Sequence, residues 1–184
     1  MTKRAASNSI TSFASSNGYE VFKDAIVVTE EDVTRLHRLT CDLGARIFNP
    51  DDKRVQASIQ PDDPVYCKLM AFFHIHGLLI GRAIGDAVAI TSHAGCRRQQ
   101  FHFDYDNSCV AIARVKPLGV LCALQNDTRL ELPHKTLFLN AGDVLCFDGD
   151  LKHAGAAYDK LNTRVHMYLD SPEVRRQHNK TYLT

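Results

Sequence analysis

Hydrophobic positions follow two different periods along the chain, and the change falls near Asp86. Before it, a short alternating segment over residues 18–22 predicts a strand, and the apolar positions that follow recur at helical spacing. Beyond it, short β-rich runs are separated by turn residues. These runs predict strands over residues 87–92, 99–104, 109–115, 119–124, 129–132, 136–139, 144–147, 154–158 and 164–169. Short strands at this spacing are typical of a double-sheet jelly roll or a cupin-like barrel.

Two helices are predicted in the first half of the chain. Thr29 places a capping hydroxyl before three acidic residues, and this helix should end near Gly44. A second, buried helix is predicted from Val65 to about Ile84. Residues 49–64 are rich in Pro and Asp and predict a loop. The sequence therefore predicts a mainly β fold of the α+β class, in which N-terminal helices pack against a β-sandwich.

The length of 184 residues fits one domain. Residues 1–17 are dominated by Ser, Asn, Ala and Thr and lack the apolar run of a secretory signal, which predicts a disordered tail. An organelle transit peptide is the alternative interpretation of this segment. The domain itself is expected to span residues 18–184.

Charge and cysteine content limit the classes of partner and the cellular compartment that we expect. With 22 basic and 21 acidic residues, the chain is not expected to bind polyanions in general, and Arg97-Arg98 and Arg175-Arg176 are predicted to be solvated surface. Six cysteines without a Cys-x-x-Cys pair predict free, buried thiols in a reducing, intracellular compartment such as the cytoplasm. The most apolar stretch, residues 69–80, is shorter than the roughly 20 residues that span a bilayer, so no membrane partner is expected.

Three residues form the main candidate site. His102 and Asp104 lie two positions apart on a predicted strand, so their side chains should point to the same side, and His153 follows a later strand. Two imidazoles and one carboxylate fill one face of an octahedron and leave positions open, which is the usual arrangement of non-haem iron oxygenases. Arg164 then offers a planar fork for a carboxylate. The sequence therefore predicts an iron(II) site beside an anion-binding arginine.

This ordered set resembles the iron(II)- and 2-oxoglutarate-dependent dioxygenase superfamily, in particular its phytanoyl- and prolyl-hydroxylase-like members. The resemblance covers residues 18–170 and rests on the motifs over residues 99–105 and 141–155 together with Arg164. It implies a double-stranded β-helix core. Many members carry Ser or Thr two positions after the arginine, where this chain has His166.

The resemblance also implies an activity. His102, Asp104 and His153 would be the iron ligands and the catalytic centre, and Arg164 would bind the far carboxylate of 2-oxoglutarate. His166 could supply a further contact to this co-substrate, or it could be a satisfied histidine beside the pocket. Fe(II), 2-oxoglutarate and O₂ would be required, and the reaction would hydroxylate or oxidatively demethylate a substrate while releasing succinate and CO₂.

Several alternatives stay open at this point. A cupin-like metal-binding protein could use the same ligands without 2-oxoglutarate turnover, and a pseudoenzyme could keep the fold alone. His74 and His76 are set aside as ligands because residues two apart on a helix point about 200° away from each other. Thr91 and Ser92 could donate hydrogen bonds near the site, although strand-edge roles are favoured. The expected substrate is a small molecule or a protein side chain, and nucleic acid is not favoured.

We expect the N-terminal tail to be dispensable. Residues 1–17 have too few apolar side chains to offset the entropy of ordering them. A chain that begins at Asn17 should therefore melt at the same temperature as the full chain and form succinate at the same rate, which calorimetry and a succinate assay would measure. A loss of either property would show that the tail packs on the domain.

Overall fold

The computed structural model describes residues 16–46, 53–176 and 181–183. Its helices are α1 (Glu30–Leu43), α2 (Pro64–Ile75) and α3 (Asn107–Val110). Its strands are β1 (Tyr19–Phe22), β2 (Ala45–Arg46), β3 (Arg54–Ser58), β4 (Ala83–Ser92), β5 (His102–Phe103), β6 (Leu118–Ala123), β7 (Thr128–Leu132), β8 (Lys135–Leu139), β9 (Val144–Asp148), β10 (Ala154–Gly155), β11 (Asn162–Asp170) and β12 (Tyr182–Leu183). The expected tail falls almost wholly on residues outside this description, so it stays a prediction.

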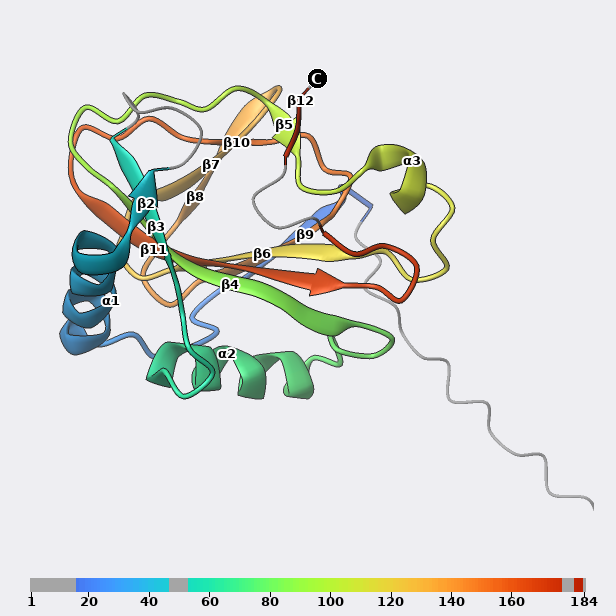
Figure 1. The fold of residues 1–184 in the computed structure, drawn as a ribbon, viewed down its shortest axis with the longest axis horizontal. Coiled ribbons are helices and arrows are strands. Elements are labelled where there is room, and N and C mark those ends of the chain that lie inside the picture. The colour runs from blue at the N-terminus through green and yellow to red at the C-terminus, as the bar shows by residue number, and fades with distance from the viewer. Residues whose placement is uncertain (1–15, 47–52, 177–180, 184) are drawn as a thin grey trace, which may run out of the picture.

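The strands form facing antiparallel layers. The large sheet has seven strands in the order β1-β9-β6-β11-β4-β3-β2, and a smaller sheet has the order β10-β7-β8. Helices α1 and α2 lie beneath the large sheet in Figure 1, and the smaller sheet lies above it. A further two-stranded pair, β12-β5, joins the C-terminal segment to the strand that carries His102. The predicted mainly β class is confirmed.

Alternation along the central strand β11 separates two interiors. Val165, Met167 and Leu169 face the helices and are buried in a cluster with side chains of α1 and α2. On the other face of the large sheet, Leu121 and Phe147 belong to a second cluster formed with β7 and β8. Burial of each such side chain stabilises the fold by about 1.5–3 kcal/mol. The large sheet is therefore held from both sides.

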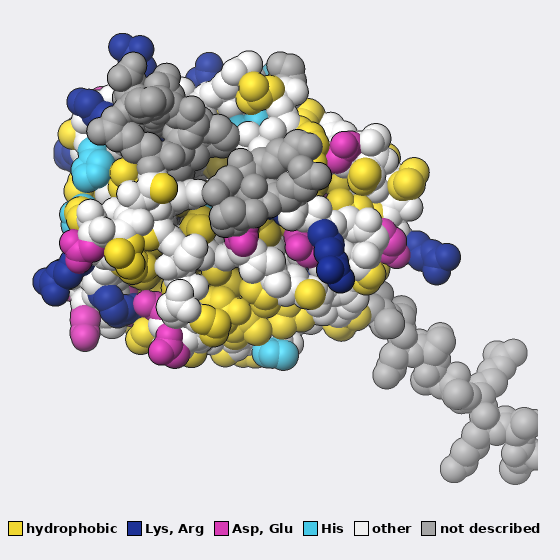
Figure 2. Space-filling model, viewed as in Figure 1, with side chains coloured by type: hydrophobic (Ala, Val, Ile, Leu, Met, Phe, Trp, Pro, Cys, Tyr) yellow, Lys and Arg dark blue, Asp and Glu magenta, His cyan; other side chains and the backbone are white. Residues whose placement is uncertain are grey.

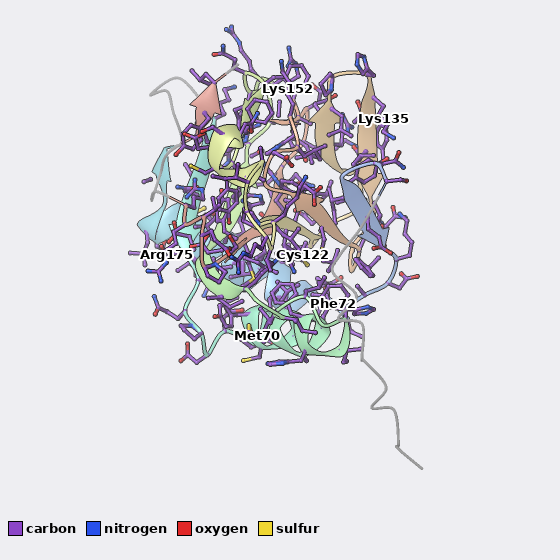
Figure 3. All side chains as sticks on the ribbon, turned by 90° about the vertical axis from the view of Figure 1, so that its right-hand side faces the viewer. Met70, Phe72, Cys122, Lys135, Lys152 and Arg175 are labelled. Carbon is purple, nitrogen blue, oxygen red and sulfur yellow. The ribbon has the colours of Figure 1, made fainter. Side chains whose placement is uncertain are left out.

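The helix–sheet core contains two of the six cysteines. Figure 3 shows Phe72 of α2 below Cys122 of β6, and both belong to the same buried cluster. Burial raises the pKa of the Cys122 thiol to about 12, so this side chain stays protonated. All six cysteines are free, as expected, but only Cys96, Cys122 and Cys146 are buried. The expectation of buried thiols therefore holds for half of them.

Helix α2 ends earlier than the sequence pattern predicts. It stops at Ile75, and Gly77 follows with a φ of 64°, in the left-handed region. The amide of Leu78 donates to the carbonyl of Phe73, and that of Gly77 donates to His74, which is the hydrogen-bond pattern of a Schellman motif. The prediction of a helix up to Ile84 is therefore wrong, because this motif ends the helix two turns sooner.

Two other predicted elements differ from the structure. Residues 109–115 were expected to form a strand, but Asp106 caps the short helix α3 by accepting a hydrogen bond from the Ser108 amide. The predicted loop over residues 49–64 contains strand β3, which pairs along β4 from Arg54 opposite Ser92. Pairing with β4, rather than local propensity, makes β3 a strand. Part of that predicted loop, residues 49–52, lies outside the described residues.

The surface of the helical layer is partly apolar. Ile75 and Ile80 are exposed at the end of α2 and just beyond it. Figure 2 shows hydrophobic side chains gathered along the lower edge of the molecule, where α2 lies in Figure 1. None of the described helices is long and apolar enough to cross a membrane.

Helix α1 begins with a capping box, as the sequence predicts. The Thr29 hydroxyl accepts a hydrogen bond from the Asp32 amide, and the Asp32 carboxylate accepts one from the Thr29 amide. Lys68 of α2 and Arg35 also donate to Asp32, at 2.7 and 3.0 Å. Burial alone would raise the pKa of Asp32, but these hydrogen bonds outweigh it and lower the pKa to about 2.

The capping box should make stability depend on acid pH. Because the folded pKa of Asp32 lies below its usual value of 3.8, its contribution to stability is present above pH 3.8 and is lost as the pH falls toward about 2. This contribution is about 2 kcal/mol. Asp32→Asn should lower the free energy of unfolding at neutral pH by a similar amount and flatten the loss between about pH 4 and pH 2, as urea titrations would measure. Asp42→Asn, at an exposed position of α1, is the matched control; equal curves for Asp32→Asn and the parent would contradict the assignment.

Candidate metal centre and adjoining cavity

The structure brings His102, Asp104 and His153 together. Their ligand atoms all lie within 4.8 Å of one another, and all three side chains are buried. The Asp104 Oδ1 atom is 4.0 Å from the His102 Nε2 atom and 3.7 Å from the His153 Nε2 atom. Two ligand atoms bound to one ion at about 2.1 Å each lie no more than about 4.2 Å apart, so both Asp104 distances are short enough for a shared ion. His74 and His76 are exposed on the far side of the large sheet.

Backbone pairing explains why residues so far apart in sequence meet. His102 and His153 form an isolated antiparallel bridge, in which the amide of each donates to the carbonyl of the other, at 2.9 and 3.0 Å. Their imidazole centroids are 4.6 Å apart. Asp104 reaches the same point because it lies two positions after His102, so its side chain points to the same side. The bridge therefore positions the group.

Hydrogen bonds orient both imidazoles. The His102 Nδ1 atom lies 2.9 Å from the Gln100 carbonyl, and the His153 Nδ1 atom lies 2.9 Å from the Leu151 carbonyl. A carbonyl only accepts, so each Nδ1 carries the hydrogen, and each Nε2 keeps its lone pair for a ligand role. Metal-binding histidines commonly have this arrangement.

Burial sets the protonation states. It is the main reason why the pKa of His102 is lowered, and it lowers the pKa of His166 to about 3, so both imidazoles are neutral near pH 7. Burial alone would raise the pKa of Asp104, but the fields of His153, His166 and His102, with a smaller contribution from Arg176, lower it. A neutral imidazole and an ionised carboxylate are the forms that bind metals.

One atom of the group is left unsatisfied. Among the described residues, the Asp104 Oδ2 atom is buried and has no hydrogen-bond partner, which is costly for a carboxylate oxygen unless a cation or donor approaches it. Gly119 of β6 makes room there, since a Cβ atom at this position would lie 3.0 Å from Asp104 Oδ2 and 2.3 Å from the Phe147 ring. The donor set, its spacing and this oxygen fit a divalent metal ion.

A cavity of about 260 Å³ adjoins the three residues. It lies between the sheets, and both the large sheet and the smaller sheet contribute to its walls. Its lining includes Arg164, His166 and Tyr168, which share one face of β11 as the sequence predicts. Leu121 and Leu130 form part of its apolar wall. The metal-ligand candidates and the predicted anion-binding arginine therefore face one space.

Arg164 is buried in the wall of this cavity. Its Nη1 atom donates to the Ser92 Oγ atom at 3.0 Å, and its guanidinium carbon lies 5.2 Å from the centre of the Tyr158 ring. Ser92 thus supports the arginine and is more than a strand-edge residue. His166 lies two positions further along β11, with its Nε2 atom 3.7 Å from Asp104 Oδ2 and its ring stacked on Phe147. It is closer to the metal-ligand group than the sequence indicated.

Sequence reasoning missed three arginines of the cavity, Arg54, Arg129 and Arg176, and two of them, Arg54 and Arg176, have buried side chains. Arg54 lay in a predicted loop, but β3 places it 1% exposed, where it donates to Ser92 Oγ at 3.2 Å and to the Ala156 carbonyl at 2.8 Å. Arg176 was predicted to be solvated surface, yet its side chain is 8% exposed and lines the cavity. Arg175 is exposed, as predicted. No local pattern distinguishes Arg175 from Arg176, because the turn after β11 decides which one points inward.

Comparison with solved structures places the fold. HygX from Streptomyces hygroscopicus, with nickel and 2-oxoglutarate bound, has a TM-score of 0.63 at 10% identity, over 85% of this chain and 84% of that one. The 2-oxoglutarate complex of the collagen prolyl hydroxylase from Paramecium Bursaria Chlorella virus-1 has a TM-score of 0.61 at 12% identity, over 84% and 96%. A Pseudomonas putida prolyl-4-hydroxylase has a TM-score of 0.61 at 13% identity, over 88% and 94%. The fold is thus the double-stranded β-helix of 2-oxoglutarate-dependent oxygenases, as expected.

Sequence comparison adds nothing to this likeness. No family model matches the chain, and no curated protein matches it. At identities of 10–13%, the solved structures show a shared fold. The chemistry must therefore be argued from the site itself.

The three-residue group should bind one divalent metal ion. His153→Ala should lower the affinity for Ni(II) by more than the roughly 10–100-fold that loss of an outer-shell partner costs, because it removes a direct ligand. Titration calorimetry with Ni(II) would measure this loss. His134→Ala, at an exposed position, is the matched control. If the His153→Ala protein bound Ni(II) as tightly as the parent, this assignment would be refuted.

Proposed function

We propose that this protein is an iron(II)- and 2-oxoglutarate-dependent dioxygenase. His102, Asp104 and His153 would hold the iron and form the catalytic centre, and Arg164 would bind the far carboxylate of 2-oxoglutarate. The observation that carries the proposal is the shared cavity, which joins a buried His-Asp-His group to a buried arginine within the fold of oxygenases. The reaction would hydroxylate or oxidatively demethylate the substrate and release succinate and CO₂.

The protein's own contribution is placement. The iron would supply the oxidative chemistry when bound, with O₂ and 2-oxoglutarate as co-substrates. The Nδ1 hydrogen bonds hold the His102 and His153 rings with Nε2 toward the ion. Both histidine side chains are buried, which limits the access of water to the reacting centre. A three-residue ligand set leaves coordination positions open for the co-substrates.

Arg164 is suited to the co-substrate because its guanidinium is held before anything binds. The Ser92 hydroxyl fixes the Nη1 atom, and the Tyr158 ring limits the movement of the side chain. A planar fork fixed in this way forms two charge-assisted hydrogen bonds with a carboxylate. We also propose that His166 contacts 2-oxoglutarate. The His166 Nε2 atom lies 3.7 Å from Asp104 Oδ2, which supports a second role for His166 in orienting the Asp104 carboxylate.

The size of the cavity bears on the substrate. Its volume of about 260 Å³ lies just under the roughly 300–1,000 Å³ of typical ligand pockets, and it must also admit 2-oxoglutarate. We therefore propose that the substrate is a small molecule or a protein side chain that enters by its reacting end. HygX has been solved with hygromycin B and a prolyl hydroxylase with a peptide, so oxygenases of this fold accept both kinds of substrate.

The role of Arg164 can be measured directly. Arg164→Ala should leave metal binding intact and weaken 2-oxoglutarate binding by roughly ten- to a hundred-fold, because a charge-assisted hydrogen bond is worth about 1.5–3 kcal/mol. Calorimetric titration of 2-oxoglutarate into the metal-loaded protein gives this affinity. Arg164→Lys keeps the charge but loses the fork and should fall between, and Arg114→Ala, at an exposed arginine, should match the parent. Equal affinity in Arg164→Ala and the parent would refute the role.

The same titrations separate the alternatives. A cupin-like metal protein would bind the metal without a response to 2-oxoglutarate, and a pseudoenzyme that keeps only the fold would bind neither. An anaerobic iron(II) titration with and without 2-oxoglutarate supplies the spectroscopic counterpart, since a visible charge-transfer band would appear only when both bind together. Substrate-stimulated succinate release from metabolite and peptide libraries would then identify the substrate.

A further inference from the structure

We propose that Arg176 binds an anionic group of the substrate, a carboxylate or a phosphate, at the end of the cavity away from Arg164. That the bound anion belongs to a substrate rests on the proposed function. The anion site itself is defined by described residues alone. Arg176, Tyr168 and Asp86 form it.

Three contacts hold Arg176 in place, two at its side chain and one at its backbone amide. Its guanidinium carbon lies 3.9 Å from the centre of the Tyr168 ring, which is the geometry of a cation–π contact. Its Nη1 atom lies 3.3 Å from the Asp86 Oδ2 atom. Its backbone amide donates to the Asp170 carboxylate at 3.3 Å. The side chain is 8% exposed, so this arginine is prearranged inside the cavity wall.

One donor of this guanidinium has no acceptor. Among residues 16–46, 53–176 and 181–183, nothing accepts a hydrogen bond from the buried Arg176 Nε atom. An unsatisfied buried donor destabilises the fold unless a ligand or water accepts from it. The Nε edge is one of the guanidinium edges that form a fork with a carboxylate or phosphate, and Asp86 contacts Nη1 instead. The arginine can therefore bind a second anion without losing Asp86.

The position along β11 separates this site from the proposed co-substrate site. Arg164, His166 and Tyr168 point to the same face, with His166 beside Asp104 in the middle of the row. Arg164 and Tyr168 are four residues apart, or about 13 Å along the strand. Arg176 stacks on Tyr168, at the end of this row of side chains opposite Arg164. The metal-ligand group thus lies between two arginines, and one anion at each end would place the metal between them.

The charge of the cavity supports an anionic substrate. Among the described residues, its walls carry four arginines, at positions 54, 129, 164 and 176, against the carboxylate of Asp104. Arg129 is also paired with Asp127 nearer the surface. A divalent cation and the two charges of 2-oxoglutarate cancel, so the positive excess would remain when both are bound. Such a cavity attracts anions and disfavours cationic groups. Asp86 offsets Arg176 only in part, because its side chain is 36% exposed and the pair is screened by water.

The test titrates inorganic phosphate and acetate separately into the full protein loaded with Ni(II) and saturating 2-oxoglutarate, with chloride at matched ionic strength as the baseline. Arg176→Gln removes the charge but keeps a planar polar group, and Arg175→Gln makes the same change at the exposed neighbour, which lies at the edge of the molecule in Figure 3. We expect saturable binding to the parent and to Arg175→Gln, and affinity lower by roughly ten- to a hundred-fold in Arg176→Gln. Tighter binding of phosphate would indicate a phosphorylated substrate, and tighter binding of acetate a carboxylate.

Two results would overturn the inference: no saturable binding of either anion to the parent, or equal binding to Arg176→Gln. If Arg176→Gln does not fold, as judged by its melting transition, Arg176→Lys replaces it; this variant keeps the charge without the fork and should bind several-fold more weakly, and an unchanged affinity would refute the fork. The titrations are repeated without 2-oxoglutarate, so the anion site is measured even if the parent fails to bind 2-oxoglutarate. That failure would refute the proposed function and leave the Arg176 result to stand by itself.

Discussion

The backbone hydrogen bonds between His102 and His153 hold the candidate site together. Each amide donates to the carbonyl of the other residue, so two histidines that lie far apart in sequence become fixed neighbours. Asp104 follows because of its two-residue spacing from His102. Burial lowers the pKa of His102 and keeps that imidazole neutral, and among the described residues it leaves Asp104 Oδ2 without a hydrogen-bond partner. A short backbone pairing thereby brings together three side chains that could hold a metal ion.

Strand β11 organises the space around that site. One face of it packs on the helices through Val165 and Met167, and the other presents Arg164, His166 and Tyr168 to the cavity. Stability and chemistry are thus divided between the two sides of one strand. Because the helix-facing side chains fix the position of β11, the side chains of Arg164, His166 and Tyr168 on its other face are fixed as well. The proposed metal site and both proposed anion sites would therefore lie beside one row of side chains on β11.

The predictions that failed have two causes. The early end of α2 and the helix α3 depend on capping hydrogen bonds that the hydrophobic period does not show, whereas the strand β3 depends on pairing with β4. Gly77 ends α2 through two backbone hydrogen bonds, and β3 is a strand because β4 offers it a pairing edge. Arg54 was overlooked for this reason, since the strand that buries it was predicted as a loop. Local hydrophobic periods indicate which segments are regular, but capping motifs and tertiary pairing decide where those segments begin and end.

The sequence by itself determined the mainly β class, the capping of α1 and the order of His102, Asp104, His153 and Arg164, because strand alternation and ligand chemistry depend on residue type and short spacing. Only the tertiary structure decided that these four residues face one cavity, since the spacing of distant segments is set by sheet register. The tertiary structure also decided that the Arg176 side chain is buried and that Arg175 is exposed. Adjacent arginines are equivalent in sequence, but the turn after β11 buries one against Tyr168 and leaves the other in solvent.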